Sequence, residues 1–209
     1  MTAHRFESAL AAFEIEDRLH PPRPGAILFT GSSSITRWNR QLPEDMAPLD
    51  VVGRGFGGST MADLLDAADR ILLPWVPRAL VVYEGDNDLA SGRPLDGVWS
   101  DFERFLTWAT ERLPAAHLYF LVVKYSPARR AIWPLMRRLN QRLWELEKQK
   151  PGRWFVLDTA TPLMTREEEP RAECYVEDGL HLSPAGVAVW RSVIRPALLA
   201  REGHTSAKT

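Results

Sequence analysis

The chain has 209 residues, of which 45% are hydrophobic and 25% charged, and its formal net charge at pH 7 is −1. This size and composition suit a single domain spanning residues 1–209, with a core large enough to fold unaided. A charge so close to zero gives no field that would attract nucleic acid or an anionic membrane surface, so neither is expected as a partner. The single cysteine, Cys174, excludes an internal disulfide framework and agrees with a reducing compartment.

The first 20 residues are amphipathic and acidic, and they lack the basic start and continuous apolar core of a signal peptide. We predict that they form an N-terminal helix that packs on the domain. No apolar run approaches the length that spans a membrane, so a cytoplasmic location is expected. The polar residues 201–209 are expected to form a flexible tail. The sequence does not indicate an oligomeric state.

Apolar runs rich in Val, Leu, Phe and Tyr alternate along the chain with segments of helical spacing. In chain order, the main predicted elements are strands at 26–31 and 49–55, a helix at 59–72, a strand at 79–85, a helix at 101–113, a strand at 117–123, a helix at 134–148, a strand at 153–158 and a helix at 183–199. The tryptophans of the helical segments are expected to lie in the core: Trp99, Trp108, Trp144 and Trp190. We therefore predict a three-layer α/β fold, in which helices cover both faces of a mostly parallel, five-stranded sheet.

Four polar loops fall where such a fold binds ligands, beyond the carboxyl ends of its strands. They read "GSSS" after the first strand, "GFGGST" after the second, "EGDNDLASG" after the third, and "VEDGLHLSPAG" between the fifth strand and the last helix. Each loop alone also has a structural interpretation, because serines cap helices and Gly, Asn and Asp-Gly build turns. Their convergence on one edge of the sheet indicates a functional site.

Ester hydrolysis by a serine needs a hydroxyl, a base, a group that orients the base, and donors for the oxyanion. His181 is the histidine that stands in a loop on the predicted ligand edge, and Asp178 precedes it by three residues. The remaining histidines lie near the termini, before a proline pair, or at the start of a strand on the opposite edge: His4, His20, His117 and His204. Ser33, or a neighbouring serine, is then the candidate nucleophile.

The four loops resemble the signature blocks of the SGNH hydrolases, also called the GDSL esterase family. The resemblance extends from "FTGSSSI" to "DGLHLSPAG" and so covers most of the chain. It implies a flavodoxin-like fold whose five parallel strands run in the order 2-1-3-4-5. It further implies that Ser33, His181 and Asp178 form a catalytic triad. It also implies that the backbone N–H groups of Ser33 and Gly58 and the side-chain amide of Asn87 form the oxyanion hole. The implied reaction is cleavage of a small-molecule carboxylic ester or thioester, and it requires no metal or organic cofactor.

The chain departs from the family pattern at two positions. Ser32 replaces the usual Asp of the first block, as in bacterial relatives that carry Gly-Ser-Ser-Ser, and Gly53 stands where many relatives have Asn. We expect the Ser32 side chain to hold the turn by bonding nearby backbone, and we expect Ser34 to cap or begin the helix.

The segment "VVKYSPAR" follows the fourth strand on the active edge and predicts part of the substrate pocket. The expected wall contains Trp38, Lys124, Tyr125, Ser126 and Arg129. Lys124 and Arg129 are compatible with an anionic or sugar-bearing substrate, and equally with a solvated surface.

Two other functions are kept open. "GRGFGG" matches the G-x-G-x-x-G fingerprint through Gly53, Gly55 and Gly58, so a nucleotide-binding oxidoreductase is one alternative. A non-catalytic ligand-binding module on the same fold is the other. A metal site made of Glu84, Asp86 and Asp88 is disfavoured, because acidic turns of this kind are usually only solvated.

Overall fold

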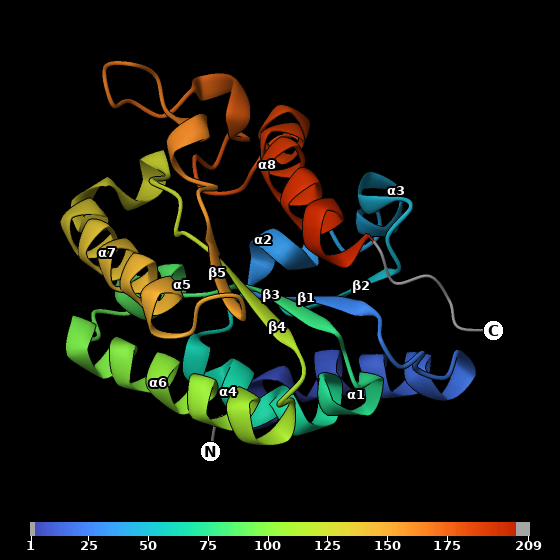
Figure 1. Cartoon of the computed structure of the whole chain (residues 1–209). Coiled ribbons are helices and arrows are strands. Elements are labelled where there is room, and N and C mark those ends of the chain that lie inside the picture. Colours follow the sequence, from blue (N-terminus) through green and yellow to red (C-terminus); the bar gives the residue numbers. More distant parts are fainter. Residues whose placement is uncertain (1–2, 204–209) are drawn as a thin grey trace.

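A five-stranded parallel sheet forms the centre of the computed structural model, which describes residues 3–203 (Figure 1). Its strands are β1 (Ile27–Gly31), β2 (Val51–Gly55), β3 (Ala79–Tyr83), β4 (His117–Leu121) and β5 (Trp154–Leu157). They lie in the order β2-β1-β3-β4-β5, and every neighbouring pair is parallel. The predicted fold class and strand order are therefore confirmed.

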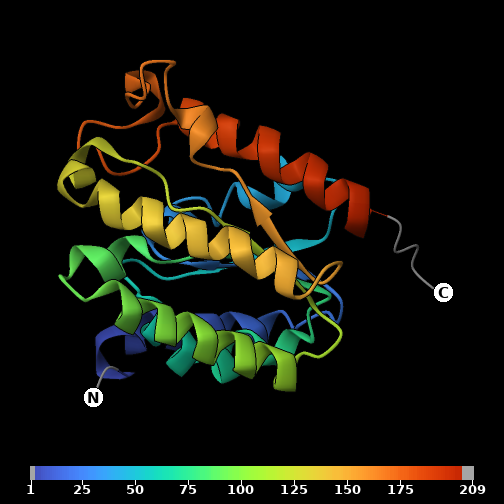
Figure 2. The ribbon, with the colours of Figure 1, turned by 60° about the vertical axis from the view of Figure 1, so that its left-hand side comes forward.

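Helices cover both faces of this sheet (Figures 1 and 2). One face packs against α1 (Ala3–Leu19), α4 (Met61–Ile71), α6 (Leu95–Arg112) and α7 (Trp133–Gln149). The other packs against α2 (Ser33–Thr36), α3 (Leu42–Met46) and α8 (Pro184–Glu202). Short elements complete the chain: α5 (Asp86–Ala90) and the 3-10 turns η1 (Leu73–Trp75), η2 (Pro127–Ile132), η3 (Thr161–Leu163) and η4 (Ala172–Cys174). Within the described residues, none of the helices has the length and apolar character needed to cross a bilayer.

The strands are buried on both faces because their side chains alternate between two cores. In β3, Leu80 and Val82 belong to the core under α4, α6 and α7, whereas Val81 and Tyr83 belong to the core under α2 and α8. This explains why the strand sequences read as continuous apolar runs.

The tryptophans of the helices do not all lie in the core. Trp190 is fully buried and donates its indole N–H to the Thr159 carbonyl over 2.9 Å. Trp99 and Trp108 are partly buried at the edge of the core. The expectation for Trp144 is wrong, since this side chain is 38% exposed. It follows the buried Leu143 by one position, which turns it about 100° away from the apolar stripe of α7.

A buried arginine fastens α1 to the edge of the sheet. Arg54 of β2 is 1% exposed, and its guanidinium pairs with Asp17 and, at 3.1 Å, with Glu16. Its guanidinium carbon lies 5.0 Å from the Phe13 ring centre and 4.8 Å from that of Trp75. The N-terminal helix thus packs on the domain through charge and aromatic contacts as well as through its apolar face.

The C-terminal boundary differs from the sequence-based one. Helix α8 continues through Glu202, although residues 201–209 were expected to form a tail. Glu202 is 4% exposed, accepts a hydrogen bond from Tyr119 Oη at 2.6 Å, and lies 2.7 Å from His117 Nδ1. These partners on β4 hold the last helical turn against the sheet. The rest of the expected tail, residues 204–209, lies outside the described residues.

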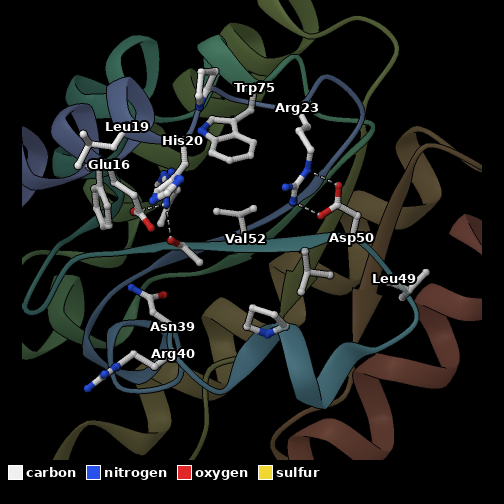
Figure 3. A pocket seen from close by; sticks show the side chains of 16 residues that line it. Glu16, Leu19, His20, Arg23, Asn39, Arg40, Leu49, Asp50, Val52 and Trp75 are labelled. Atoms are coloured by element: carbon white, nitrogen blue, oxygen red, sulfur yellow. Dashed lines mark hydrogen bonds and ion pairs between the residues drawn. The ribbon is translucent and has the colours of Figure 1, made fainter.

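Strand β2 forms one edge of the sheet and borders a cavity of about 810 Å³, the β2-edge cavity (Figure 3). Side chains of α1 and the following loop, of the segment between α2 and α3, and of β2 itself surround this cavity. Two carbonyls of β2 are occupied by side chains: Arg54 donates to Gly53 over 3.1 Å, and Asn39 donates to Gly55 over 3.2 Å. The β2-edge cavity flanks the sheet, whereas the polar loops meet beyond the carboxyl ends of the strands.

Candidate active site

The structure brings Ser33, His181 and Asp178 into one hydrogen-bonded line. Ser33 is the first residue of α2, two positions after the last residue of β1. Its Oγ lies 2.9 Å from His181 Nε2, and His181 Nδ1 lies 2.6 Å from Asp178 Oδ2. When Nδ1–H donates a hydrogen bond to the carboxylate, Nε2 carries no proton and can accept that of the Ser33 hydroxyl. The arrangement can therefore activate the hydroxyl as a nucleophile.

The loop that carries Asp178 and His181 is fixed by its own carboxylate. Asp178 Oδ1 accepts the backbone N–H groups of Leu180 at 2.8 Å and of His181 at 2.9 Å. The hydrogen bond from the His181 ring, and then these backbone N–H groups, hold the pKa of Asp178 well below its usual range. Asp178 is therefore ionised at neutral pH and can stabilise a protonated imidazole beside it.

The other two serines of the turn have different environments. Ser32 is the N-cap residue of α2, but its side chain makes no capping hydrogen bond, contrary to the expectation. Its backbone holds the turn instead, because its N–H donates to the Tyr83 carbonyl at 3.3 Å and its carbonyl accepts the Ile35 N–H at 3.0 Å. Ser34 lies in the first turn of α2, as expected, and its Oγ is 3.4 Å from Lys124 Nζ.

The loops after β2 and β3 lie beside Ser33. A Cβ added to Gly57 would lie 3.9 Å from Ser33 Cβ, so the loop after β2 passes close to the hydroxyl. Gly58 has a φ of +83°, a conformation that favours glycine. Asn87 donates from Nδ2 to the Ser59 carbonyl at 2.9 Å and accepts at Oδ1 from Arg129 at 3.5 Å. These bonds orient the amide and leave one Nδ2 hydrogen for another acceptor.

The predicted pocket wall is only partly open. Lys124 is 1% exposed and Ser126 is fully buried, so neither forms the wall of an open pocket, contrary to the expectation. Tyr125 is partly buried, and its ring packs 5.9 Å from that of Trp133. Trp38 is itself buried but does border a cavity beside Ser34.

Lys124 instead lies at the centre of a buried polar network. Its Nζ is 3.1 Å from Tyr83 Oη, 3.3 Å from Asp86 Oδ2 and 3.4 Å from Ser34 Oγ. Arg129 donates from Nε to the other oxygen of Asp86 at 3.0 Å. The network joins the turn that carries Ser33 to the arginine that contacts Asn87.

The acidic residues after β3 do not converge on a common point. Glu84 Oε1 accepts the Ser59 hydroxyl at 2.5 Å, Asp86 pairs with Lys124, and Asp88 accepts backbone N–H groups of Met61 and Gly85. No group of three His, Cys, Asp or Glu side chains suited to a metal ion occurs within the described part of the chain.

Glu84 provides a test through pH. Burial, and then the neighbouring Asp88 carboxylate, raise the pKa of Glu84 well above its usual value. The folded chain therefore holds this proton more tightly than the unfolded chain, in which the pKa is about 4.3. Stability contributed by Glu84 is fully present below that value and is lost as the pH rises.

Glu84→Gln should remove this titration while keeping an acceptor for Ser59. In urea unfolding at a series of pH values from about 5 to 8, the free energy of unfolding of the wild type is expected to fall relative to that of the variant. Parallel curves for the two proteins would show that Glu84 is ionised when folded.

The "GRGFGG" segment does not form a phosphate-binding loop. Gly53 and Gly55 lie within β2, and only the third glycine of the fingerprint, Gly58, lies in the loop. A Cβ at Gly53 would lie 2.2 Å from Asn39 Oδ1, and one at Gly55 would lie 2.7 Å from Ile35 Cβ. These two glycines allow α2 and the residues after it to approach β2 closely, which explains their presence without a nucleotide.

Two arginines near the site were not predicted. Arg37 Nη2 lies 4.0 Å from Asp178 Oδ2, and Arg5 donates from Nη2 to the Gly58 carbonyl over 3.3 Å. Arg37 follows Ser33 by four positions, so helical spacing already placed it on the same side of α2. The sequence holds no local signal for Arg5, because its contact joins residues 53 positions apart.

Comparison with known proteins agrees with this geometry. A family model described as the GDSL-like lipase/acylhydrolase family matches residues 20–189, whereas no curated protein matches the chain significantly. A structure from Streptococcus pneumonia, provisionally named a platelet activating factor, is 20% identical, with 92% of each chain covered and a TM-score of 0.81.

Two further solved structures are similar in fold. A GDSL-like lipase from Bacteroides thetaiotaomicron is 19% identical over 91% of this chain and 97% of its own, with a TM-score of 0.78. A mutant of an acetyl-xylooligosaccharide esterase from Geobacillus Stearmophilus is 14% identical over 87% and 95%, with a TM-score of 0.66. At these identities the structural matches show a shared fold, and the family model shows the membership. The chain is therefore an ester-bond hydrolase that belongs to the GDSL-like lipase/acylhydrolase family.

Proposed function

We propose that this protein cleaves carboxylic esters through an acyl-enzyme on Ser33. The observation that supports this most directly is the line of hydrogen bonds from Ser33 Oγ through His181 to Asp178. His181 Nε2 takes the hydroxyl proton as Oγ bonds to the ester carbonyl carbon. The imidazolium then gives that proton to the alkoxy oxygen, and the bond from carbonyl carbon to alcohol breaks.

Water completes the cycle at the same histidine. It attacks the acyl carbon, gives a proton to His181 Nε2, and the proton passes to Ser33 Oγ as the carboxylic acid leaves. In each half-reaction, acylation and deacylation, the carbonyl oxygen of the substrate becomes an oxyanion. We assign its stabilisation to the N–H groups of Ser33 and Gly58 and to the free Nδ2 hydrogen of Asn87. The reaction as proposed uses no metal or organic cofactor.

The proposed substrates are small acyl esters, and acetylated sugars, lysolipids and acyl thioesters are further classes to test. The acetyl-xylooligosaccharide esterase of the same fold motivates the acetylated sugars. A panel of p-nitrophenyl esters of increasing chain length, measured beside acetylated sugars and acyl thioesters, separates these classes. A protein that only binds ligands would turn over none of them.

Labelling with a fluorophosphonate tests the choice of serine. We expect peptide mass spectrometry to find the phosphonate on Ser33 alone, because its Oγ is the hydroxyl that contacts His181 Nε2. Ser33→Ala should abolish labelling and turnover together. Ser32→Ala and Ser34→Ala should still be labelled at Ser33. A phosphonate on Ser32 or Ser34, or labelling that survives Ser33→Ala, would contradict the assignment.

A further inference from the structure

A second cavity, of about 450 Å³, lies between α2, α3 and α8 and is lined in part by residues that follow Ser33 and His181 in the chain. We call it the α2/α8 cavity. Ser34 of α2 and Arg37, the residue directly after this helix, line one side of it. Leu182 and Ser183, which follow His181, line the other. A substrate held at Ser33 therefore has this cavity as a neighbouring space.

The α8 wall of this cavity is mainly apolar, and its length limits the group that fits. The residues that line it are Pro184, Val187, Ala188 and Arg191, so the wall extends along seven residue-to-residue steps of the helix. At 1.5 Å per residue this corresponds to about 10 Å. A substituent of roughly six to eight bonds would reach along the wall from the reacting carbon.

Almost every polar side chain that lines the α2/α8 cavity already has a partner inside the protein. Asp45 accepts from Trp38 Nε1 at 2.7 Å and from Arg191 at 3.0 Å, so the charges of Asp45 and Arg191 compensate each other. Gln41 donates to Glu44 over 2.8 Å. The remaining lining hydroxyls are bonded as well: Ser34 to Lys124, and Ser183 to the Glu173 carbonyl and the Gly186 N–H.

Arg37 is the exception. Its side chain is 57% exposed, and among residues 3–203 the carboxylate nearest to its guanidinium is that of Asp178, at 4.0 Å. That distance is beyond hydrogen bonding, and Asp178 already accepts bonds from His181 and from two backbone N–H groups. The planar fork of Arg37 donors thus remains available to a ligand, and this fork matches the oxygens of a carboxylate or phosphate.

We propose that the α2/α8 cavity receives an anionic part of the ester substrate, and that Arg37 binds its negatively charged oxygens. This inference rests on the proposed function, since it takes Ser33 as the position of the ester. It makes Arg37 a specificity-determining residue that favours esters carrying a carboxylate or phosphate several bonds from the scissile carbonyl.

Matched pairs of esters test the proposal. In the acyl pair, mono-4-nitrophenyl adipate is compared with its methyl ester. In the alcohol pair, 4-carboxyphenyl acetate is compared with its methyl ester, so the two pairs distinguish which side of the ester enters the cavity. For at least one pair we expect wild-type kcat/KM to favour the anionic ester, and we expect this preference to decrease as salt is added.

Arg37→Gln should reduce the ratio of kcat/KM for the anionic ester to that for the neutral ester by roughly 10- to 100-fold, the range for a hydrogen bond to a charged group. Arg40→Gln is the matched control, because Arg40 lines the β2-edge cavity instead, and it should leave the ratio unchanged. Ser33→Ala supplies the background rate for every ester.

Two results would overturn the proposal while leaving the proposed function intact. In the first, the ratio of kcat/KM for the anionic ester to that for the neutral ester is near one in the wild type for both pairs, and Arg37→Gln does not change it. In the second, Arg37→Gln lowers kcat/KM equally for the anionic and the neutral ester, which would mean that Arg37 acts through Asp178. If the wild type hydrolyses no ester faster than Ser33→Ala does, the proposed function itself fails.

Discussion

Replacement of His181 by alanine is expected to lower kcat for ester hydrolysis about 10²–10⁴-fold, the usual contribution of a positioned acid–base group. His181 Nε2 is the ring nitrogen that lies 2.9 Å from Ser33 Oγ. Two other histidines have different surroundings and cannot substitute for it. His20 lines the β2-edge cavity, and His117 contacts Glu202 on the far side of the molecule from the loops.

This loss should occur without unfolding, because the His181 ring contacts Ser33 and Asp178 rather than the core. Steady-state kinetics and thermal unfolding on one preparation separate the two effects. Asp178→Asn should be less harmful than His181→Ala, since the asparagine keeps an oxygen for the backbone N–H groups of Leu180 and His181. Wild-type turnover in His181→Ala, or a greater loss in Asp178→Asn, would contradict the proposed roles.

The second large effect is expected at Asn87. If its free Nδ2 hydrogen binds the oxyanion, Asn87→Ala should cost about 2.7–4 kcal/mol in the transition state, or about 10²–10³-fold in kcat. KM should change little, because the interaction forms mainly as negative charge develops on the oxygen. Initial rates at saturating substrate measure this loss.

Asn39→Ala is a matched control for the structural part of that effect. Like Asn87, Asn39 donates its side-chain amide to a backbone carbonyl, that of Gly55, at 3.2 Å. Both variants should lose some thermal stability, and only Asn87→Ala should lose kcat per folded molecule. Near-normal kcat in Asn87→Ala, together with a lower melting temperature, would show that Asn87 serves only the turn.

The sequence was informative where local patterns determine structure. Continuous apolar runs predicted the parallel sheet, because strands covered by helices on both faces have no polar side. The rule that ligands bind at the carboxyl ends of strands then placed Ser33 and His181 at one edge, although they are 148 positions apart.

Features that depend on distant partners could not be predicted in this way. Because Lys124 follows an apolar strand, the sequence predicts that its side chain is exposed to solvent. Its burial depends instead on Asp86, 38 positions away. The end of α8 depends on Tyr119, whose hydroxyl holds Glu202 across 83 positions. Arg37 was missed for another reason: helical spacing placed it near Ser33, but only the structure shows that its cavity neighbours are already bonded.

The side-chain hydrogen bonds to β2 also affect whether other copies of the chain can add a strand at this edge of the sheet. An outermost strand normally offers a row of free carbonyl and N–H groups on which a foreign strand can add, and aggregation often begins there. Here Arg54 and Asn39 occupy the Gly53 and Gly55 carbonyls. A strand that added at this edge would first have to break both bonds and separate Arg54 from its partners on α1. The chain can therefore keep a wide opening beside its sheet while resisting edge-to-edge polymerisation.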